Sequence, residues 1–252
     1  MILEFKRKED SENTTREDKK ANMTSPIKPA IKLQCQYKKA VGDGLTSIIK
    51  EGGDVNKFKS VSKAYKSLKQ YDKAIKNLNK AKEFCHFDPE VYYELGLNHL
   101  LNSENEEARK NFIRTIKLDN KNLNAQIQLG LSHENLDEDE MAEKIYKKII
   151  EENPKYMEAY NHLAGLYIKL EMYNEALLVF YDMLKVNPNY YRANLGIGIC
   201  FDRLKRYSYA VRFYKKYICK KPNSSTARTL ANRILEIYST KQSRDEGLLS
   251  IV

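Results

Sequence analysis

The feature that most constrains the fold of this chain is a periodicity of 34 residues. Alanine recurs at that interval, and residues of matching kind surround each copy. A small residue precedes each alanine by twelve positions, and a large apolar residue follows it by four. The alanines are Ala74, Ala108, Ala142, Ala176 and Ala210. A fixed period of this length indicates a repeat protein, in which each unit packs on its neighbours.

The apolar pattern predicts two amphipathic helices in each unit. In the fourth unit the first stripe consists of Tyr160, Leu163, Ala164 and Tyr167. The second stripe consists of Tyr173, Ala176, Leu177, Phe180 and Leu184. A short polar segment between the stripes predicts a turn, so the two helices should pack antiparallel. Proline cannot continue a helix, so Pro154, Pro188 and Pro222 mark the ends of the last three units. His86 and Asn120 occupy the same position in the first two units.

These residues resemble the tetratricopeptide repeat. The resemblance in the fourth unit is carried by Tyr160, Leu163, Ala164, Tyr167, Tyr173, Ala176, Phe180 and Pro188. It covers residues 55–224 as five contiguous units. It departs at His99 and His133, where the family favours Tyr or Phe, and at Gln126 and Asn194, where it favours a large apolar residue. The resemblance implies an all-α, right-handed superhelical solenoid of helix-turn-helix repeats, with a concave groove for peptides or protein segments.

The segments outside the five repeats are expected to cap the solenoid or to stay flexible. A helical stripe of Ala227, Leu230, Ala231, Ile234, Leu235 and Tyr238 predicts a C-terminal capping helix over residues 225–241, followed by a flexible tail at 242–252. Tyr37 and Ala40 lie one period before Tyr71 and Ala74, which predicts a degenerate capping half-repeat at residues 31–54. Gly42 and Gly44 oppose that helix by about 1 kcal/mol each. Residues 1–30 have few apolar side chains and are expected to be a disordered arm.

No motif for catalysis, cofactor binding or metal ligation is evident. The four histidines show no HxxxH or HExxH spacing, and His99 and His133 occupy core positions of the repeat. Gly196 and Gly198 lack the preceding strand and third glycine of a dinucleotide site. The chain is therefore expected to be non-catalytic, with neither a cofactor nor a metal.

Cysteine spacing and hydropathy indicate a cytoplasmic protein. The four cysteines show no CxxC spacing, which is typical of free thiols in a reducing compartment. No secretory signal is visible, and no apolar run approaches the roughly 20 residues of a membrane helix. At the C-terminus, Ser250, Ile251 and Val252 match the S-x-V ending that PDZ domains bind, although a match of three residues also arises by chance.

The resemblance also implies that positions 5, 9 and 12 of each first helix line the groove. In the first unit these positions hold Lys59, Lys63 and Lys66. This row is interpreted either as a docking stripe for an acidic segment or as an ordinary solvated lysine face. The later units place there Tyr93, Leu97, Leu100, Ile127, Leu131, Asn161, Ile168, Leu195 and Ile199. This mostly apolar row predicts a peptide-binding groove, unless a cap, the N-terminal segment or a tight superhelix covers it.

The distribution of charge decides between two classes of partner. The net charge is +10, but the five units carry +6, −1, −4, −2 and +8 in turn. A nucleic-acid track should be basic along its length, so the acidic middle favours a charged protein partner or a neighbouring copy of the chain. The sequence therefore predicts a protein-interaction scaffold. An RNA-binding helical repeat and an accessory subunit of a larger enzyme complex are the alternatives.

Overall fold

The computed structural model describes residues 29–249, which form twelve α-helices and no strand. The first helix is α1 (Pro29–Glu51) and the last is α12 (Ser225–Leu249). Between them lie the pairs α2 (Val55–Ser67) with α3 (Tyr71–Phe84), α4 (Pro89–Leu101) with α5 (Asn105–Leu118), α6 (Leu123–Glu134) with α7 (Asp139–Glu152), α8 (Met157–Lys169) with α9 (Tyr173–Val186), and α10 (Tyr191–Arg203) with α11 (Tyr207–Lys220). The fold is thus an all-α solenoid of helical repeats. Within the described residues, no helix is both long and apolar enough to span a bilayer.

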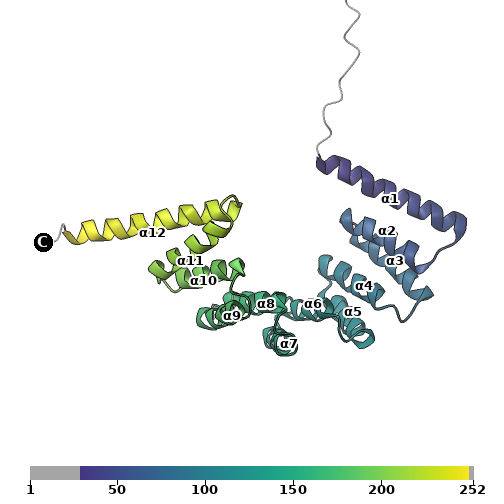
Figure 1. Cartoon of the computed structure of the whole chain (residues 1–252). Coiled ribbons are helices and arrows are strands. Elements are labelled where there is room, and N and C mark those ends of the chain that lie inside the picture. The colour runs from purple at the N-terminus through teal and green to yellow at the C-terminus, as the bar shows by residue number, and fades with distance from the viewer. Residues whose placement is uncertain (1–28, 250–252) are drawn as a thin grey trace, which may run out of the picture.

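The helix pairs follow one another along an arc (Figure 1). The first helices α2, α4, α6 and α8 lie on the inner side of the arc, and α3, α5, α7 and α9 lie on the outer side. Helices α1 and α12 occupy the two ends. First helices of consecutive repeats also touch one another, α4 with α6 and α6 with α8. The arc therefore presents a concave surface built from the first helices.

A residue with left-handed backbone conformation closes the first helix of every repeat. The five such residues are Lys69, Ser103, Asp137, Glu171 and Lys205, with φ between 58° and 63°. After each of them a backbone N–H donates to the carbonyl five residues earlier, as from Gln70 to Tyr65 at 2.9 Å. This hydrogen bond is typical of the helix ending known as the Schellman motif, which usually contains glycine. No glycine marks these turns in the sequence, so the polar segment between the two apolar stripes and the period locate them.

The core of each repeat forms where its two helices meet. All five periodic alanines are fully buried. At three first helices a glycine faces a large ring of the second helix, in the pairs Gly96 with Phe112, Gly130 with Tyr146 and Gly198 with Tyr214. A Cβ added to any of these glycines would lie 2.4–2.6 Å from a ring carbon. The small residue therefore leaves the space that the ring fills, and the pair of helices packs closely.

Both ends differ from the sequence prediction. Helix α12 continues to Leu249, because no glycine or proline interrupts residues 225–246, and the boundary expected at 241 is wrong. Helix α1 begins at Pro29, inside the expected arm, and runs unbroken through Gly42 and Gly44. Gly44 lets α1 approach α2, since a Cβ there would lie 2.5 Å from the Val61 side chain. The rest of the expected arm, at 1–28, and the C-terminal residues 250–252 lie outside the described residues.

Candidate protein-binding surface

The three lysines interpreted as a docking stripe or as a solvated face lie on α2, where carboxylates on α4 or at its N-cap pair with them. The contacts are Lys66 with Glu94 at 2.5 Å, Lys63 with Glu90 at 3.1 Å, and Lys59 with Asp88 at 3.1 Å and also with Glu90. We call these six residues the lysine ladder. Because each ammonium has an acidic partner on α4 or at its N-cap, this face is not the row of free cations that the sequence suggests.

The ion pairs of the ladder stabilise both charged forms. Hydrogen bonds from Lys59 and then from Lys63 lower the pKa of Glu90 below its ordinary value. Burial lowers the pKa of Lys59, but hydrogen bonds with Glu90 and Asp88 outweigh that effect and raise the pKa overall. The ladder therefore joins the first repeat to the second, and its charges are largely satisfied within the chain.

Most of the apolar row predicted for the groove lies on the first helices and is partly exposed. These partly exposed residues are Tyr93, Leu97, Leu100, Leu131, Ile168, Leu195 and Ile199. Ile127 is the exception, because α6 packs against both α4 and α8 and leaves this side chain only 1% exposed. The prediction that Ile127 lines an open groove is therefore wrong, and it belongs to the core. Asn161 donates a hydrogen bond to the Tyr190 hydroxyl at 2.7 Å and so links α8 to the start of α10.

Polar side chains also connect the first helices in the middle of the arc. The Tyr156 hydroxyl, just before α8, lies 2.8 Å from Asn124 Oδ1 on α6 and 3.0 Å from a Glu158 oxygen. Burial, followed by the hydrogen bond with Glu158, raises the pKa of Tyr156 to about 12. The hydroxyl consequently keeps its proton at neutral pH and can act as a donor between neighbouring repeats.

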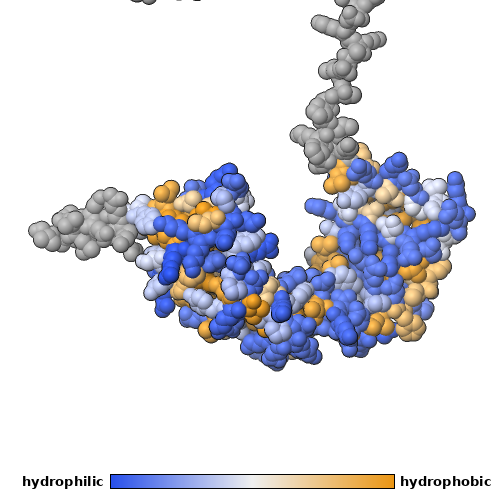
Figure 2. Space-filling model, viewed as in Figure 1, coloured by the Kyte–Doolittle hydropathy of each residue, from blue (hydrophilic) through white to orange (hydrophobic). Residues whose placement is uncertain are grey.

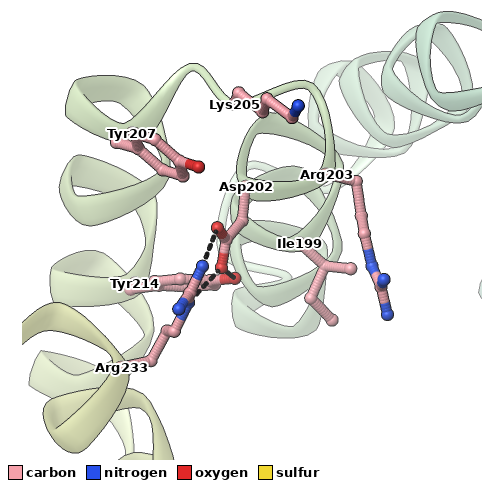
Figure 3. A pocket seen from close by; sticks show the side chains of 7 residues that line it. All are labelled: Ile199, Asp202, Arg203, Lys205, Tyr207, Tyr214 and Arg233. Atoms are coloured by element: carbon pink, nitrogen blue, oxygen red, sulfur yellow. Dashed lines mark hydrogen bonds and ion pairs between the residues drawn. The ribbon is translucent and has the colours of Figure 1, made fainter. Parts of the chain in front are cut away.

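The last repeat adds a hollow at the C-terminal end of the row. Its volume is about 560 Å³, and it is lined by Ile199, Asp202, Arg203, Lys205, Tyr207, Tyr214 and Arg233. Figure 3 shows Arg233 reaching from α12 to Asp202 on α10, with Tyr214 of α11 beside the same carboxylate. Ile199 lies next to this group, between Asp202 and Arg203 in that view. The hollow therefore brings one residue of the predicted row together with a set of charged side chains.

The charge of Asp202 is taken up within the chain. Arg233 donates two hydrogen bonds to its carboxylate, both at 2.9 Å, and the Tyr214 hydroxyl donates a third at 3.0 Å. The Arg233 guanidinium is the main cause that lowers the pKa of Asp202, and burial opposes it. Among the described residues, Arg203 and Lys205 form no ion pair. Beside an apolar side chain, the hollow thus presents two cations that have no carboxylate within ion-pair distance in the described part of the chain.

Sequence reasoning named Ile199 but missed Asp202, Arg203 and Arg233. A signal was available, since Asp202 is the single acidic residue in a unit with nine basic residues and stands at position 12 of its first helix. A lone carboxylate in such a basic unit is expected to find a cation nearby. The identity of that cation, on the capping helix 31 residues later, depends on how α12 packs.

The described residues contain no group of three or more His, Cys, Asp or Glu side chains that could hold a metal ion. His99 and His133 each lie 2.5 Å from a glutamate, Glu104 and Glu138, and so fasten the turns that follow their helices. Cys200 is fully buried, and burial raises the pKa of its thiol to about 11.

Comparisons with known proteins agree with this architecture. A family model described as TPR repeat matches residues 63–103, and one described as tetratricopeptide repeat matches 123–156 and 158–190. No curated protein matches the sequence.

Solved structures with a similar fold include two of the protein MamA. One has a TM-score of 0.56 and 20% identity, covering 67% of this chain and 92% of MamA. Another, from Desulfovibrio magneticus RS-1, has a TM-score of 0.57 and 15% identity, covering 68% and 97%. YrrB, a TPR protein with an unusual peptide-binding site, has a TM-score of 0.53 and 19% identity, covering 77% of this chain and 100% of YrrB.

Proposed function

Because the chain belongs to the tetratricopeptide-repeat family of protein-interaction modules, we propose that its concave surface binds an extended or helical segment of a partner protein. The observation that carries this proposal is the row of partly exposed apolar residues on neighbouring first helices. Leu131, Ile168, Leu195 and Ile199 extend along three successive repeats toward the hollow beside Arg203. Apolar anchors of this kind supply affinity when a peptide covers them.

The two cations at the end of the row indicate the charge of the partner segment. The lysine ladder is paired, so an acidic partner would have to displace Glu90 or Glu94 before it could bind Lys59, Lys63 or Lys66. Arg203 and Lys205 need no such exchange. We therefore place an acidic flank of the segment at the end of α10, where it would set orientation and speed association. The peptide-binding site of YrrB supports the use of this fold for binding peptides.

The experiment is a selection of random peptides displayed on phage against the full chain, followed by affinity measurement on variants. Leu131→Glu and Ile168→Glu place a charge on the concave row. Leu178→Glu is the matched control, because Leu178 is 66% exposed on the outer helix α9. Binding should weaken at least tenfold, or about 1.4 kcal/mol, with either concave variant and stay unchanged with the control. Equal affinity for all three variants would contradict the proposal, provided circular dichroism shows that each is folded.

RNA binding is a second candidate because the outer face of the last repeat is basic. Arg212, Lys215, Lys216 and Lys220 line a hollow of about 620 Å³ and form no ion pair among the described residues. A titration with single-stranded RNA at physiological salt separates the two candidates. Tight, salt-sensitive binding that Lys215→Glu abolishes would favour RNA. We expect weak binding, because the acidic middle of the chain interrupts the basic surface.

A further inference from the structure

Each end of the solenoid carries one helix of a repeat without its mate. Helix α1 has the place of a second helix, since Tyr37 and Ala40 lie one period before Tyr71 and Ala74. Helix α12 has the place of a first helix, since Ala227 lies one period after Ala193. In the described part of the chain, α1 packs mainly on α2 and α12 mainly on α11. At each end, the face of the helix that would pack on the other helix of the same repeat therefore has no such partner in the described part of the chain. We call it the leftover face.

The leftover face of α12 is apolar and exposed. It consists of Ala231, Leu235 and Tyr238, which share one side of the helix, and Leu235 is 66% and Tyr238 49% exposed. One period earlier, Ile197 is fully buried and Phe201 is 7% exposed. Phe201 stacks on two rings of its own second helix, with centroids 5.2 Å and 5.9 Å away. Leu235 has the same place in the repeat but lacks a second helix to cover it.

A hollow of about 600 Å³ lies between α11 and α12. Of the leftover face, Tyr238 alone lines it, together with apolar residues such as Val211 and Ile237 and basic residues such as Arg206 and Arg233. The sequence predicts that Leu235 and Tyr238 help to cover the last repeat. Instead, Ala227, Leu230 and Ile234 are buried against the repeat, and the apolar stripe is wider than the surface it covers.

The leftover face of α1 is the counterpart. Leu33, Tyr37 and Ala40 follow one another at intervals of four and three residues, which places them on one side of the helix, before Gly44 meets Val61 of α2. Leu33 is 49% exposed, and Ala40 is exposed as well. Ala40 has the place of the five periodic alanines, all of which are fully buried against their own first helix. Figure 2 shows hydrophobic surface at both ends of the arc.

We propose that α12 of one copy packs on α1 of a second copy, so that the two helices complete a sixth repeat across the junction. The contact continues an interface that the chain already forms five times between the two helices of a repeat. In that arrangement the exposed faces of Leu235 and Ala40 gain the kind of partner that buries Phe201 and Ala210 within the chain.

Helix length allows an extended contact across the junction. With 23 and 25 residues, the two helices extend about 35 Å and 38 Å at 1.5 Å per residue, longer than the helices of 12–14 residues in the repeats. The junction can thus be longer than any helix pair within the chain.

The symmetry and salt dependence of this contact follow from its chemistry. A head-to-tail contact leaves a free end on each copy, so association continues into chains or closes into a ring. The faces are apolar, and the charges beside them are of both signs, with Lys38, Lys39 and Asp43 on α1 and Arg228 and Glu236 on α12, so apolar burial dominates the contact. Added salt should therefore preserve or strengthen association. Docking of a basic end on an acidic waist would instead weaken with salt.

Sedimentation velocity of the full chain over a range of concentrations tests the proposal. The wild type should form species larger than the dimer as concentration rises. Leu235→Glu breaks the α12 face and Ala40→Glu breaks the α1 face, so each variant alone should stay at the monomer mass of 29.4 kDa. Mixed in equal amounts, the two should form a dimer that grows no further, because only one intact face remains on each. Thr229→Glu, at an exposed site of α12 away from this face, is the control and should assemble as the wild type does.

Three outcomes would overturn the proposal. The wild type could remain monomeric at every concentration. Ala40→Glu could assemble by itself, which would indicate a contact between two α12 helices. The mixed variants could fail to pair although circular dichroism shows both to be folded. The junction uses only the ends of the arc, so peptide binding to the concave surface is measured independently of all three.

Discussion

Two glycines in first helices should respond differently to the same substitution. Gly130 on α6 faces the ring of Tyr146, and a Cβ there would lie 2.4 Å and 2.7 Å from two ring carbons. Tyr146 is fully buried and its hydroxyl donates to Glu134 at 2.5 Å, so the ring cannot swing away. Gly165 on α8 has no atom within 4 Å of the same added Cβ. An alanine side chain would therefore crowd the Tyr146 ring at position 130 and meet no neighbouring atom at position 165.

The magnitude of each effect follows from two opposing terms. Replacing glycine by alanine inside a helix stabilises it by about 1 kcal/mol, and both sites gain this term. Overpacking in a fixed core costs about 1–3 kcal/mol, and only Gly130→Ala incurs it. Gly165→Ala should thus stabilise the chain by up to about 1 kcal/mol. Gly130→Ala should be less stable than Gly165→Ala by the whole overpacking cost, about 1–3 kcal/mol.

Thermal unfolding followed by circular dichroism measures this difference. For a chain of this size, 1 kcal/mol corresponds to a shift in Tm of about 2–4 °C. Gly165→Ala should unfold above the wild type, and Gly130→Ala should unfold below Gly165→Ala by several degrees. Equal Tm values for the two variants would refute the close contact between the glycine at this repeat position and the ring of the second helix.

Three further predictions concern charge and thiols. Asp202→Asn should cost about 1–2 kcal/mol at neutral pH, because Arg233 loses one of its two charged partners and keeps only Glu236. The pKa of Asp202 is lowered in the folded chain, so the stability difference between wild type and variant is fully present above the ordinary aspartate pKa and disappears as pH falls through the folded value. Urea unfolding at several pH values measures this stability difference. A difference that does not change with pH would contradict the prediction. Glu94→Lys places like charges together in the lysine ladder, so it should lower the free energy of unfolding by up to about 1 kcal/mol. The loss should be larger at low salt, and an increase in stability would be evidence against the ladder. Iodoacetamide at mildly alkaline pH should alkylate exposed Cys35 and Cys219 well before Cys200, as peptide mass spectrometry would show; equal rates would contradict the burial that raises the Cys200 pKa to about 11.

The repeats could be predicted from the sequence because each unit repeats the same local pattern. The periodic alanines and the large residue four positions later are buried at the same interface in every unit, so 34-residue spacing alone locates the helix pairs. The turns were harder, because Lys69, Asp137 and Glu171 adopt the left-handed conformation without being glycine. At those residues the hydrogen bonds of the helix end hold the backbone, so the polar segment predicts a turn but no glycine identifies the left-handed residue within it.

The candidate site was predicted only in part, because contacts between repeats depend on how the units stack. Lys59, Lys63 and Lys66 lie together on α2 as the spacing predicts, yet their partners come from 27–29 residues away, in the next unit. Ile127 and Leu131 occupy groove positions one turn apart on α6, but only Ile127 is covered by the adjacent first helices. The ion pairs of the lysine ladder and the burial of Ile127 both depend on the distance between neighbouring units. A pattern within one unit does not determine that distance.

Hydrogen exchange of the full chain, measured by mass spectrometry with and without a selected peptide, tests most directly where a partner segment binds. Binding in the concave surface should slow exchange in α6, α8 and α10, which carry the proposed anchors Leu131, Ile168, Leu195 and Ile199. The outer helices α7 and α9 should change little. Slower exchange confined to α7, α9 and α11, with the first helices unchanged, would contradict binding in the concave surface.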